Sequence, residues 1–228
     1  MTWDPIWEQL FSSRAWGRYP GEDLIRFVMR SFSSVSVADR SAVRVLEVGS
    51  GTGANLWFLA REGFATYGVE GSPTATAICA RRLDEECPAW RRRSGGGELI
   101  TGDISRLPWP DGHFDALIDC EAVYCNDVES SRAIYREMFR TARSGARLFV
   151  RTFATGSWGD GLGQRLEPGR FIADEGPLEG KGASRFTAYE QISELLSPWQ
   201  IVEVNLITRS LDAQRHSVRE WIIEGHKI

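Results

Sequence analysis

The strongest constraint on the fold is the stretch from residue 43 to residue 61. Val43–Val48 is a β-branched, apolar run, and three alternating glycines follow it at positions 49, 51 and 53. A helical pattern over Leu56–Arg61 comes next. Glycines in such a loop allow the backbone to approach a ligand, and the N-terminus of the following helix points at it. The stretch therefore predicts a strand, a ligand-binding loop and a helix, the first unit of an α/β sheet.

The same alternation continues along the chain. We expect strands at Ala65–Glu70, Leu99–Asp103, Phe114–Cys120 and Arg147–Phe153, and helices at 72–83 and 128–143. Two further strands, about Gln200–Thr208 and Val218–Gly225, have no helix between them. The pattern predicts a Rossmann-like, doubly wound seven-stranded sheet that is mostly parallel with an antiparallel closing strand.

With 228 residues the chain is long enough for one large domain. We expect a single domain over residues 1–228, with an N-terminal helical cap at 1–40. Residues 154–186 are rich in glycine and lack sustained periodicity, which predicts a substrate-side loop or lid.

Charge and composition limit the classes of partner and function that we expect for this chain. A net charge of -4 argues against broad attraction to nucleic acid or to an anionic membrane, so we expect neither as a partner. The four cysteines show no Cys-x-x-Cys spacing and no companion histidines, so no metal is expected. No apolar run approaches the ~20 residues that span a bilayer, and Met1–Pro5 does not resemble a signal peptide. These features predict a cytoplasmic protein, a monomer or a homodimer.

Three acidic residues, Glu47, Glu70 and Asp103, fall at the carboxyl ends of the first three predicted strands. Carboxylates suit a cationic ligand better than the pyrophosphate of a dinucleotide. The dinucleotide pattern Gly-x-Gly-x-x-Gly/Ala is met only through Ala54, with a glycine at 53 instead.

Three motifs occur in order: Glu47–Gly53, then Glu70, then Gly102–Asp103 followed by Leu107–Asp115. In this respect the chain resembles the class I S-adenosylmethionine (SAM) dependent methyltransferases, particularly the small bacterial enzymes of the type 11 group. The resemblance extends from Val43 to Phe153.

The resemblance implies SAM as the cofactor. Glu47 would lie near its amino acid portion, Glu70 would accept both ribose hydroxyls, and Asp103 would accept from the adenine amino group with Ile104 beside the ring. The implied cofactor-binding residues are Glu47, Gly49, Ser50, Gly51, Gly53, Glu70, Gly71, Asp103, Ile104 and Glu121.

The acceptor side is less defined. Relatives carry a histidine or an acid near positions 124 and 125, where this chain has Tyr124 and Cys125. Glu121 and Tyr124 are candidates to orient or deprotonate the acceptor, the alternative being that they satisfy local backbone groups. His216, expected in the loop between the closing strands, is a third candidate base.

Three aromatic residues, Trp16, Tyr19 and Trp158, lie outside strong periodic patterns, in the cap and in the long loop. Their rings are candidates for the substrate side, through stacking or cation-π contacts. Hydrophobic packing at the surface is the alternative.

The expected function is methyl transfer from SAM to an oxygen or nitrogen of a small-molecule acceptor, by in-line displacement. Two alternatives remain. A nicotinamide-dependent oxidoreductase would use the same strand and turn, although it would leave Asp103 without a role. A non-catalytic partner subunit would keep the methyltransferase fold while another chain supplies the chemistry.

Overall fold

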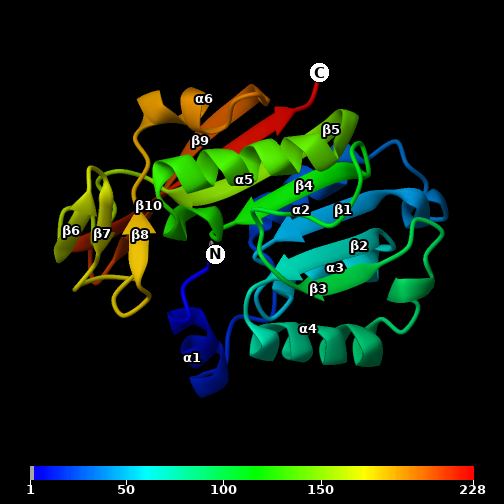
Figure 1. The fold of residues 1–228 in the computed structure, drawn as a ribbon, viewed down its shortest axis with the longest axis horizontal. Helices are drawn as coiled ribbons and strands as arrows, with labels where there is room; N and C mark the ends of the chain where they lie inside the picture. Colours follow the sequence, from blue (N-terminus) through cyan, green and yellow to red (C-terminus); the bar gives the residue numbers. More distant parts are fainter. Residues whose placement is uncertain (1–2) are drawn as a thin grey trace.

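A seven-stranded sheet forms the centre of the protein. The computed structural model describes residues 3–228, and the strand order is β3-β2-β1-β4-β5-β10-β9 (Figure 1). Strands β1 to β5 are parallel, whereas β10 is antiparallel to both β5 and β9. The predicted fold class is confirmed. The strands are β1 (Arg44–Val48), β2 (Ala65–Glu70), β3 (Glu98–Thr101), β4 (Phe114–Cys120), β5 (Ala142–Phe153), β9 (Gln200–Leu211) and β10 (His216–His226).

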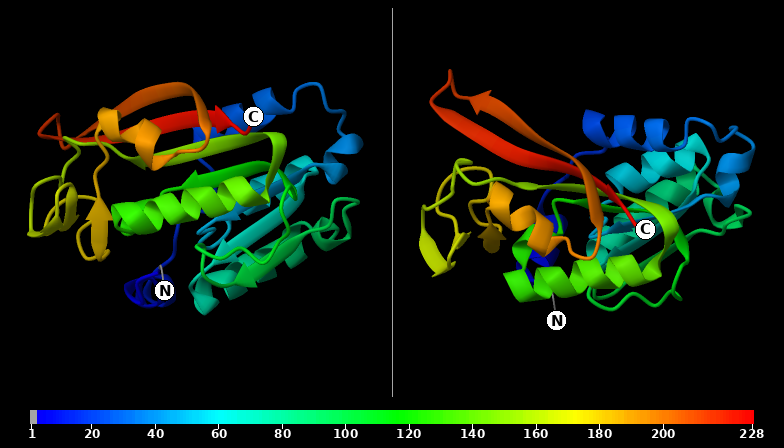
Figure 2. Two further views of the ribbon diagram at one scale, coloured as in Figure 1. Left: turned by 45° about the horizontal axis from the view of Figure 1, so that its top comes forward. Right: turned by 90° about the horizontal axis from the view of Figure 1, so that it is seen from above.

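Helices cover both faces of this sheet (Figure 2). Helices α2, α3 and α4 pack on one face, and α5 and α6 pack on the other. In β1, Val45 packs in the core under α2, α3 and α4, and Leu46 packs in the core under α5 and α6. Successive residues therefore face opposite sides of the sheet, as expected for a strand. Both faces are therefore apolar, as in other parallel sheets. The helices are α2 (Glu22–Ser31), α3 (Ala54–Glu62), α4 (Pro73–Glu86), α5 (Val128–Thr141) and α6 (Ile192–Leu195), with short 3-10 helices at Asp39–Ala42, Trp90–Arg92, Val123–Cys125 and Tyr189–Gln191.

Local sequence signals fix the ends of the helices that approach the ligand-binding edge. The Ser72 side chain accepts a hydrogen bond from the Ala75 N–H, and Pro73 occupies the first turn of α4. Helix α3 ends at Glu62, and Gly63, with φ +99°, forms its C-cap.

Some elements are longer than predicted. Helix α5 ends at Thr141 and β5 begins at Ala142, so residues 142–146, expected at the helix end and the following turn, belong to the strand. Gly145, with φ +77°, lies where the β4–β5 register shifts, and this irregularity hides the start of the strand from its sequence pattern.

The segment 154–186 is not an irregular loop. It contains a small antiparallel sheet of β6 (Gln164–Glu167), β7 (Arg170–Ile172) and β8 (Ala183–Arg185). Phe171 and Phe186 of this segment pack in a third apolar core with residues from the main sheet. Its glycines form tight turns: eight of them have positive φ. The sequence did not reveal these strands, because glycine-rich turns between very short strands leave no periodic pattern.

The N-terminal region divides into two parts. Residues 1–2 of the predicted cap lie outside the described residues. Helix α1 (Ile6–Ser13) has no buried residue and lies beside the start of α4, whereas α2 buries Leu24, Phe27 and Val28 against the sheet (Figure 1). Only α1 is positioned at the edge where the glycine loop lies.

Within residues 3–228, no helix has the length and apolar character needed to cross a membrane.

Candidate active site

The loop between β1 and α3 places three glycines at the carboxyl edge of the sheet. Gly49, Gly51 and Gly53 have φ of +65°, +51° and +83°, a region that side chains disfavour. A Cβ on Gly49 would lie 2.2 Å from the Ala122 Cβ, and one on Gly53 would lie 2.2 Å from the Cys79 Sγ. Backbone conformation and close packing together fix this loop.

Glu47 lies directly behind the loop, 2% exposed. Its Oε1 accepts a hydrogen bond from the Asn55 side chain at 2.5 Å, but its buried Oε2 has no hydrogen-bond partner within the described residues. Burial raises the pKa of Glu47 to about 8, against the opposing effect of the Asn55 hydrogen bond. The Ser50 hydroxyl is also buried without a partner there. A ligand bound at the loop would supply the hydrogen bonds that these two atoms lack within the described residues.

Glu70, at the end of β2, ties this strand to the loop. Its carboxylate accepts from the backbone N–H of Gly51 and of Ser72, both at 2.8 Å. Burial raises its pKa, and the two backbone hydrogen bonds oppose that rise. The residue therefore organises the loop as well as presenting a carboxylate beside it.

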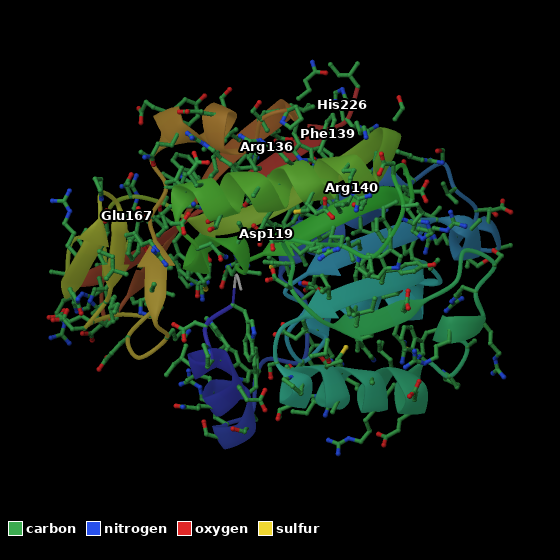
Figure 3. All side chains as sticks on the ribbon, viewed as in Figure 1. Asp119, Arg136, Phe139, Arg140, Glu167 and His226 are labelled. Atoms are coloured by element: carbon green, nitrogen blue, oxygen red, sulfur yellow. The ribbon has the colours of Figure 1, made fainter. Side chains whose placement is uncertain are left out.

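Asp103 shapes the third part of the edge. Its Oδ1 accepts from the backbone N–H and the hydroxyl of Ser105 at 2.9 and 2.7 Å, which stabilises the turn after β3. The connection that follows is held by Arg140 of α5 (Figure 3), whose guanidinium donates to the carbonyls of Leu107 and Trp109 at 3.0 Å each. Ile104, which follows Asp103, is buried at the same edge.

Glu121, after β4, has an unusual backbone. Its φ is +57°, in the left-handed region that costs a non-glycine residue about 1–2 kcal/mol. Asp119, under α5 (Figure 3), stabilises this turn: its Oδ1 accepts from the N–H of Ala122 and Val123 at 3.0 and 3.1 Å, and its Oδ2 accepts from the Tyr135 hydroxyl at 2.6 Å. Backbone strain of this kind is concentrated at functional sites.

The N-terminal segment, Trp3–Phe11, lies across the glycine loop. A Cβ on Gly71 would lie 2.6 Å from the Trp3 ring, and one on Gly51 would lie 3.5 Å from the Phe11 ring. The Glu8 carboxylate accepts from the hydroxyls of Ser72 and Thr74 at the start of α4. These contacts hold α1 against the carboxyl edge of the sheet.

A cavity of about 90 Å³ lies between this segment and the loops of the sheet edge. It is bordered on one side by aromatic rings and on the other by backbone and carboxylates. The cavity is smaller than the ~300 Å³ at which ligand pockets for small molecules begin. Its lining residues are Trp3, Asp4, Trp7, Phe11, Gly49, Glu70, Gly71, Gly102, Ile104, Glu121, Ala122 and Cys125.

The predicted cofactor residues are brought together at this edge. Five of them line the cavity, and the others lie in the same loops or, for Glu47, directly behind them. The lining five are Gly49, Glu70, Gly71, Ile104 and Glu121; the others are Glu47, Ser50, Gly51, Gly53 and Asp103.

The predicted acceptor-side residues are more dispersed. Tyr124 is 2% exposed and packs on Phe153 at 5.1 Å between ring centroids, so it lies in the third core and not in the cavity lining. His216 is the first residue of β10 and not a loop residue as predicted, because the hairpin strands extend further than their sequence pattern indicates. It stacks on Trp158 at 3.9 Å, away from the cavity lining.

The two remaining aromatic residues differ in position. Trp16 packs on Phe11 and Trp7, with ring centroids 5.2 and 5.9 Å away, behind the rings that face the cavity. Tyr19 is 70% exposed and lies edge-on to Trp57. Neither ring lines the cavity.

Sequence reasoning missed several residues of the site. Trp3, Trp7 and Phe11 line the cavity although the N-terminal segment was predicted only as part of a cap. The available signal was an apolar helix face with no assigned packing partner. Cys125 also lines the cavity, and burial raises the pKa of its thiol to about 12, so it stays uncharged at neutral pH. Within residues 3–228, no group of three or more acidic, cysteine or histidine side chains is arranged to hold a metal ion.

Comparison with known proteins shows which proteins share this fold and loop. A family model described as a methyltransferase domain matches residues 45–145. The demethylmenaquinone methyltransferase of Beutenbergia cavernae is 31% identical over 163 residues, covering 70% of this chain and 60% of that protein. The corresponding protein of Tropheryma whipplei is 29% identical over 170 residues, covering 70% and 61%.

The crystal structure of a SAM-dependent methyltransferase from Methanosarcina mazei has the same fold, with a TM-score of 0.63 and 19% identity over 81% of this chain and 92% of that one. In sequence the chain is similar to methyltransferases, and in fold it is similar to a SAM-dependent methyltransferase. It spans about six tenths of the length of the curated relatives described above.

The residues of the site fit SAM as a cofactor. Among residues 3–228 the buried Glu47 Oε2 has no hydrogen-bond partner, and the ammonium of SAM would supply a donor to it. The glycine loop presents backbone where a Cβ would collide with its neighbours. The carboxylates at 47 and 70 match a ligand that carries an ammonium and hydroxyl groups.

Proposed function

We propose that this protein transfers a methyl group from SAM to an oxygen or nitrogen of a small-molecule acceptor. The observation that carries the proposal is the shared cavity: the glycine loop, Glu70 and Glu121 all line it. A cofactor held by the glycine loop and Glu70 would present its reactive end toward the wall that contains Glu121.

The position of each residue supports a cofactor-binding role. Glu47 would accept from the ammonium of the amino acid portion, and that positive charge would favour its ionised form. Glu70 would accept the ribose hydroxyls while keeping its hydrogen bonds to the loop. Asp103 would accept from the adenine amino group and Ile104 would flank the ring. The backbone that surrounds the ligand would come from Gly49, Ser50, Gly51, Gly53 and Gly71.

When bound, SAM supplies an electrophilic methyl group on its sulfonium. The chain contributes orientation and exclusion of water: the acceptor lone pair must lie in line with the methyl–sulfur bond. Trp3, Trp7 and Phe11, which line the cavity, would shield the reacting atoms from water. Glu121 would orient the acceptor and take its proton where the acceptor arrives protonated.

The acceptor site would continue into a neighbouring hollow of about 260 Å³. This hollow shares Trp3, Asp4 and Cys125 with the cavity and adds the polar side chains of Asn126, Asp127, Ser130 and Arg170. Two of the curated relatives are named for demethylmenaquinone, which carries a quinone ring. A planar ring would suit the indoles, with polar substituents directed toward the hollow.

We also propose that residues 1–228 act as a single cytoplasmic domain, a monomer or homodimer, and that residues 154–186 cover the acceptor as a lid. Arg170 and Ala183 of that segment border the hollow, which supports the second part. Hydrogen exchange with and without S-adenosylhomocysteine tests it: protection that rises in residues 154–186 supports a lid, and equal strong protection contradicts it.

Titration calorimetry tests the cofactor, since S-adenosylhomocysteine should bind and NAD and NADP should not. Micromolar binding of a nicotinamide nucleotide without a response to S-adenosylhomocysteine would favour the oxidoreductase. Transfer of a labelled methyl group from SAM to members of a panel of phenols, amines and quinols then distinguishes the enzyme from a non-catalytic partner subunit.

A further inference from the structure

One arginine links the cavity wall to a buried acid. The Nε of Arg151, on β5, lies 2.9 Å from the Glu121 Oε1 and donates to the Glu220 Oε1 at 3.1 Å. Its Nη2 donates to the Glu220 Oε2 at 2.6 Å. Glu220, on β10, is 2% exposed, whereas the Glu121 side chain is 34% exposed and lines the cavity. Two carboxyl groups, one open to the cavity and one enclosed, therefore share one guanidinium.

The backbone holds this arrangement in place. The N–H of Glu121 donates to the carbonyl of Arg151 at 2.9 Å, so the left-handed residue is anchored to the strand that carries its partner. The other non-glycine residues with positive φ within the described chain, Asp212, Ala213 and Gln214, form the β9–β10 turn, where such angles are common. Glu121 is the exception, held at the cavity wall by Asp119 and Arg151.

The charges around the pair are unequal. Glu121 faces Arg151, Glu220 and Lys181 of the segment before β8, while Glu220 also has the Arg209 Nη2 of β9 at 3.6 Å. Burial and the hydrogen bond with Glu220 raise the pKa of Glu121 to about 8. Burial also raises the pKa of Glu220, but its hydrogen bonds with Glu121 and Arg151 and the arginine charges outweigh burial and lower it overall. Neighbouring acids of this kind titrate as a pair.

We propose that Glu121 and Glu220 share one proton beside Arg151, and that this pair receives the proton released by the methyl acceptor. The O–H or N–H bond of the acceptor breaks, its proton passes to the Glu121 carboxylate, and its electron pair forms the bond to the methyl carbon. Glu220 does not touch the acceptor; it is a positioning residue that sets the proton affinity of Glu121. A base with a pKa near the working pH is the most effective for this purpose.

Receipt of the acceptor's proton depends on the proposed methyl transfer, whereas sharing of a proton by the two acids does not. The test is therefore a pH titration of the intact protein with ¹³C-labelled glutamate carboxyl groups, followed by NMR. The parent should show two carboxyl groups that titrate near pH 8, because Glu47 also has a pKa of about 8. Glu47→Gln should remove one of them, and Glu121→Gln the other.

Glu220→Gln should lower the pKa of Glu121 by about one pH unit or more, because the substitution removes the carboxyl group that raises this pKa. If this variant does not fold, Glu121→Gln gives the reciprocal measurement, because the pKa of Glu220 should then rise. Glu224→Gln, on the same strand but paired with Arg30, is the matched control and should leave Glu121 unchanged.

An unchanged Glu121 titration in Glu220→Gln, or the lack of a second titration near pH 8, overturns the proposal. If both titrations appear as expected but S-adenosylhomocysteine does not bind, the proposed function fails and the shared proton stands. Once an acceptor is known, the pH profile of methyl transfer should shift in Glu220→Gln in the same direction as the titration.

Discussion

The two walls of the cavity are built in different ways. The wall formed by the glycine loop and Glu70 consists of backbone in demanding conformations, with almost no space for an added atom. The opposite wall consists of side chains from Trp3–Phe11, the segment that leads into α1, a helix with no buried residue. Small changes to the first should therefore affect both folding and binding, whereas changes to the second should leave the fold intact. The following predictions test this difference.

The largest effect is expected for Gly49→Ala. The new Cβ would meet the Ala122 Cβ at 2.2 Å in a residue with φ +65°, so overpacking and backbone strain add up to about 2–5 kcal/mol of lost stability. Cofactor binding should disappear with it. Urea unfolding and calorimetry measure the two effects. Gly145→Ala is the control, because its φ of +77° is similar but nothing lies within 4 Å; it should cost only about 1–2 kcal/mol. Equal losses would show that the loop is not tightly packed.

Glu47→Gln should change how stability depends on pH. A carboxyl whose folded-state pKa is raised to about 8 stabilises the fold below its unfolded pKa of ~4.3, and this contribution is lost as pH rises toward 8. Relative to the variant, the parent should therefore lose about 2–3 kcal/mol between pH 5 and pH 7. Urea unfolding at three pH values measures this, and parallel pH profiles would contradict burial of a neutral Glu47.

Glu70→Ala should weaken S-adenosylhomocysteine binding by about 1.5–3 kcal/mol, the range for hydrogen bonds to a charged group. It should also lower stability, because the N–H groups of Gly51 and Ser72 lose their acceptor. Asp103→Ala should weaken binding less. Calorimetry and thermal unfolding separate the two effects, and undiminished cofactor binding in Glu70→Ala would exclude the ribose role.

The smallest effect on stability is expected on the aromatic wall. Phe11→Ala should cost less than about 1 kcal/mol, because α1 buries no residue completely. Leu24→Ala is the matched control in α2, where the side chain is 1% exposed, and it should cost about 2–5 kcal/mol. Chemical unfolding compares them directly. A loss for Phe11→Ala as large as for Leu24→Ala would mean that α1 is part of the folded core.

The same difference between the walls explains which parts of the site the sequence predicts and which it does not. Glu47, Glu70 and the glycine loop are signalled locally, because strand ends, glycines and helix caps lie within a few residues of one another. The contact between Trp3 and Gly71 depends on where α1 docks, and an amphipathic pattern does not specify its partner. Arg151 and Glu220 meet only through the antiparallel register of β5 and β10, across 69 residues of sequence. The small sheet in 154–186 was missed because its strands are too short to show a periodic pattern.

The position of α1 gives the protein an optical reporter of its own. Trp3 and Trp7 line the cavity, whereas tryptophans such as Trp90 and Trp199 are enclosed in the cores behind the sheet. A ligand that enters the cavity meets or displaces these two indoles, so their fluorescence should change on binding. Emission from the unlabelled protein, compared with Trp3→Phe and Trp7→Phe variants, would follow occupancy of the cavity without any chemical label.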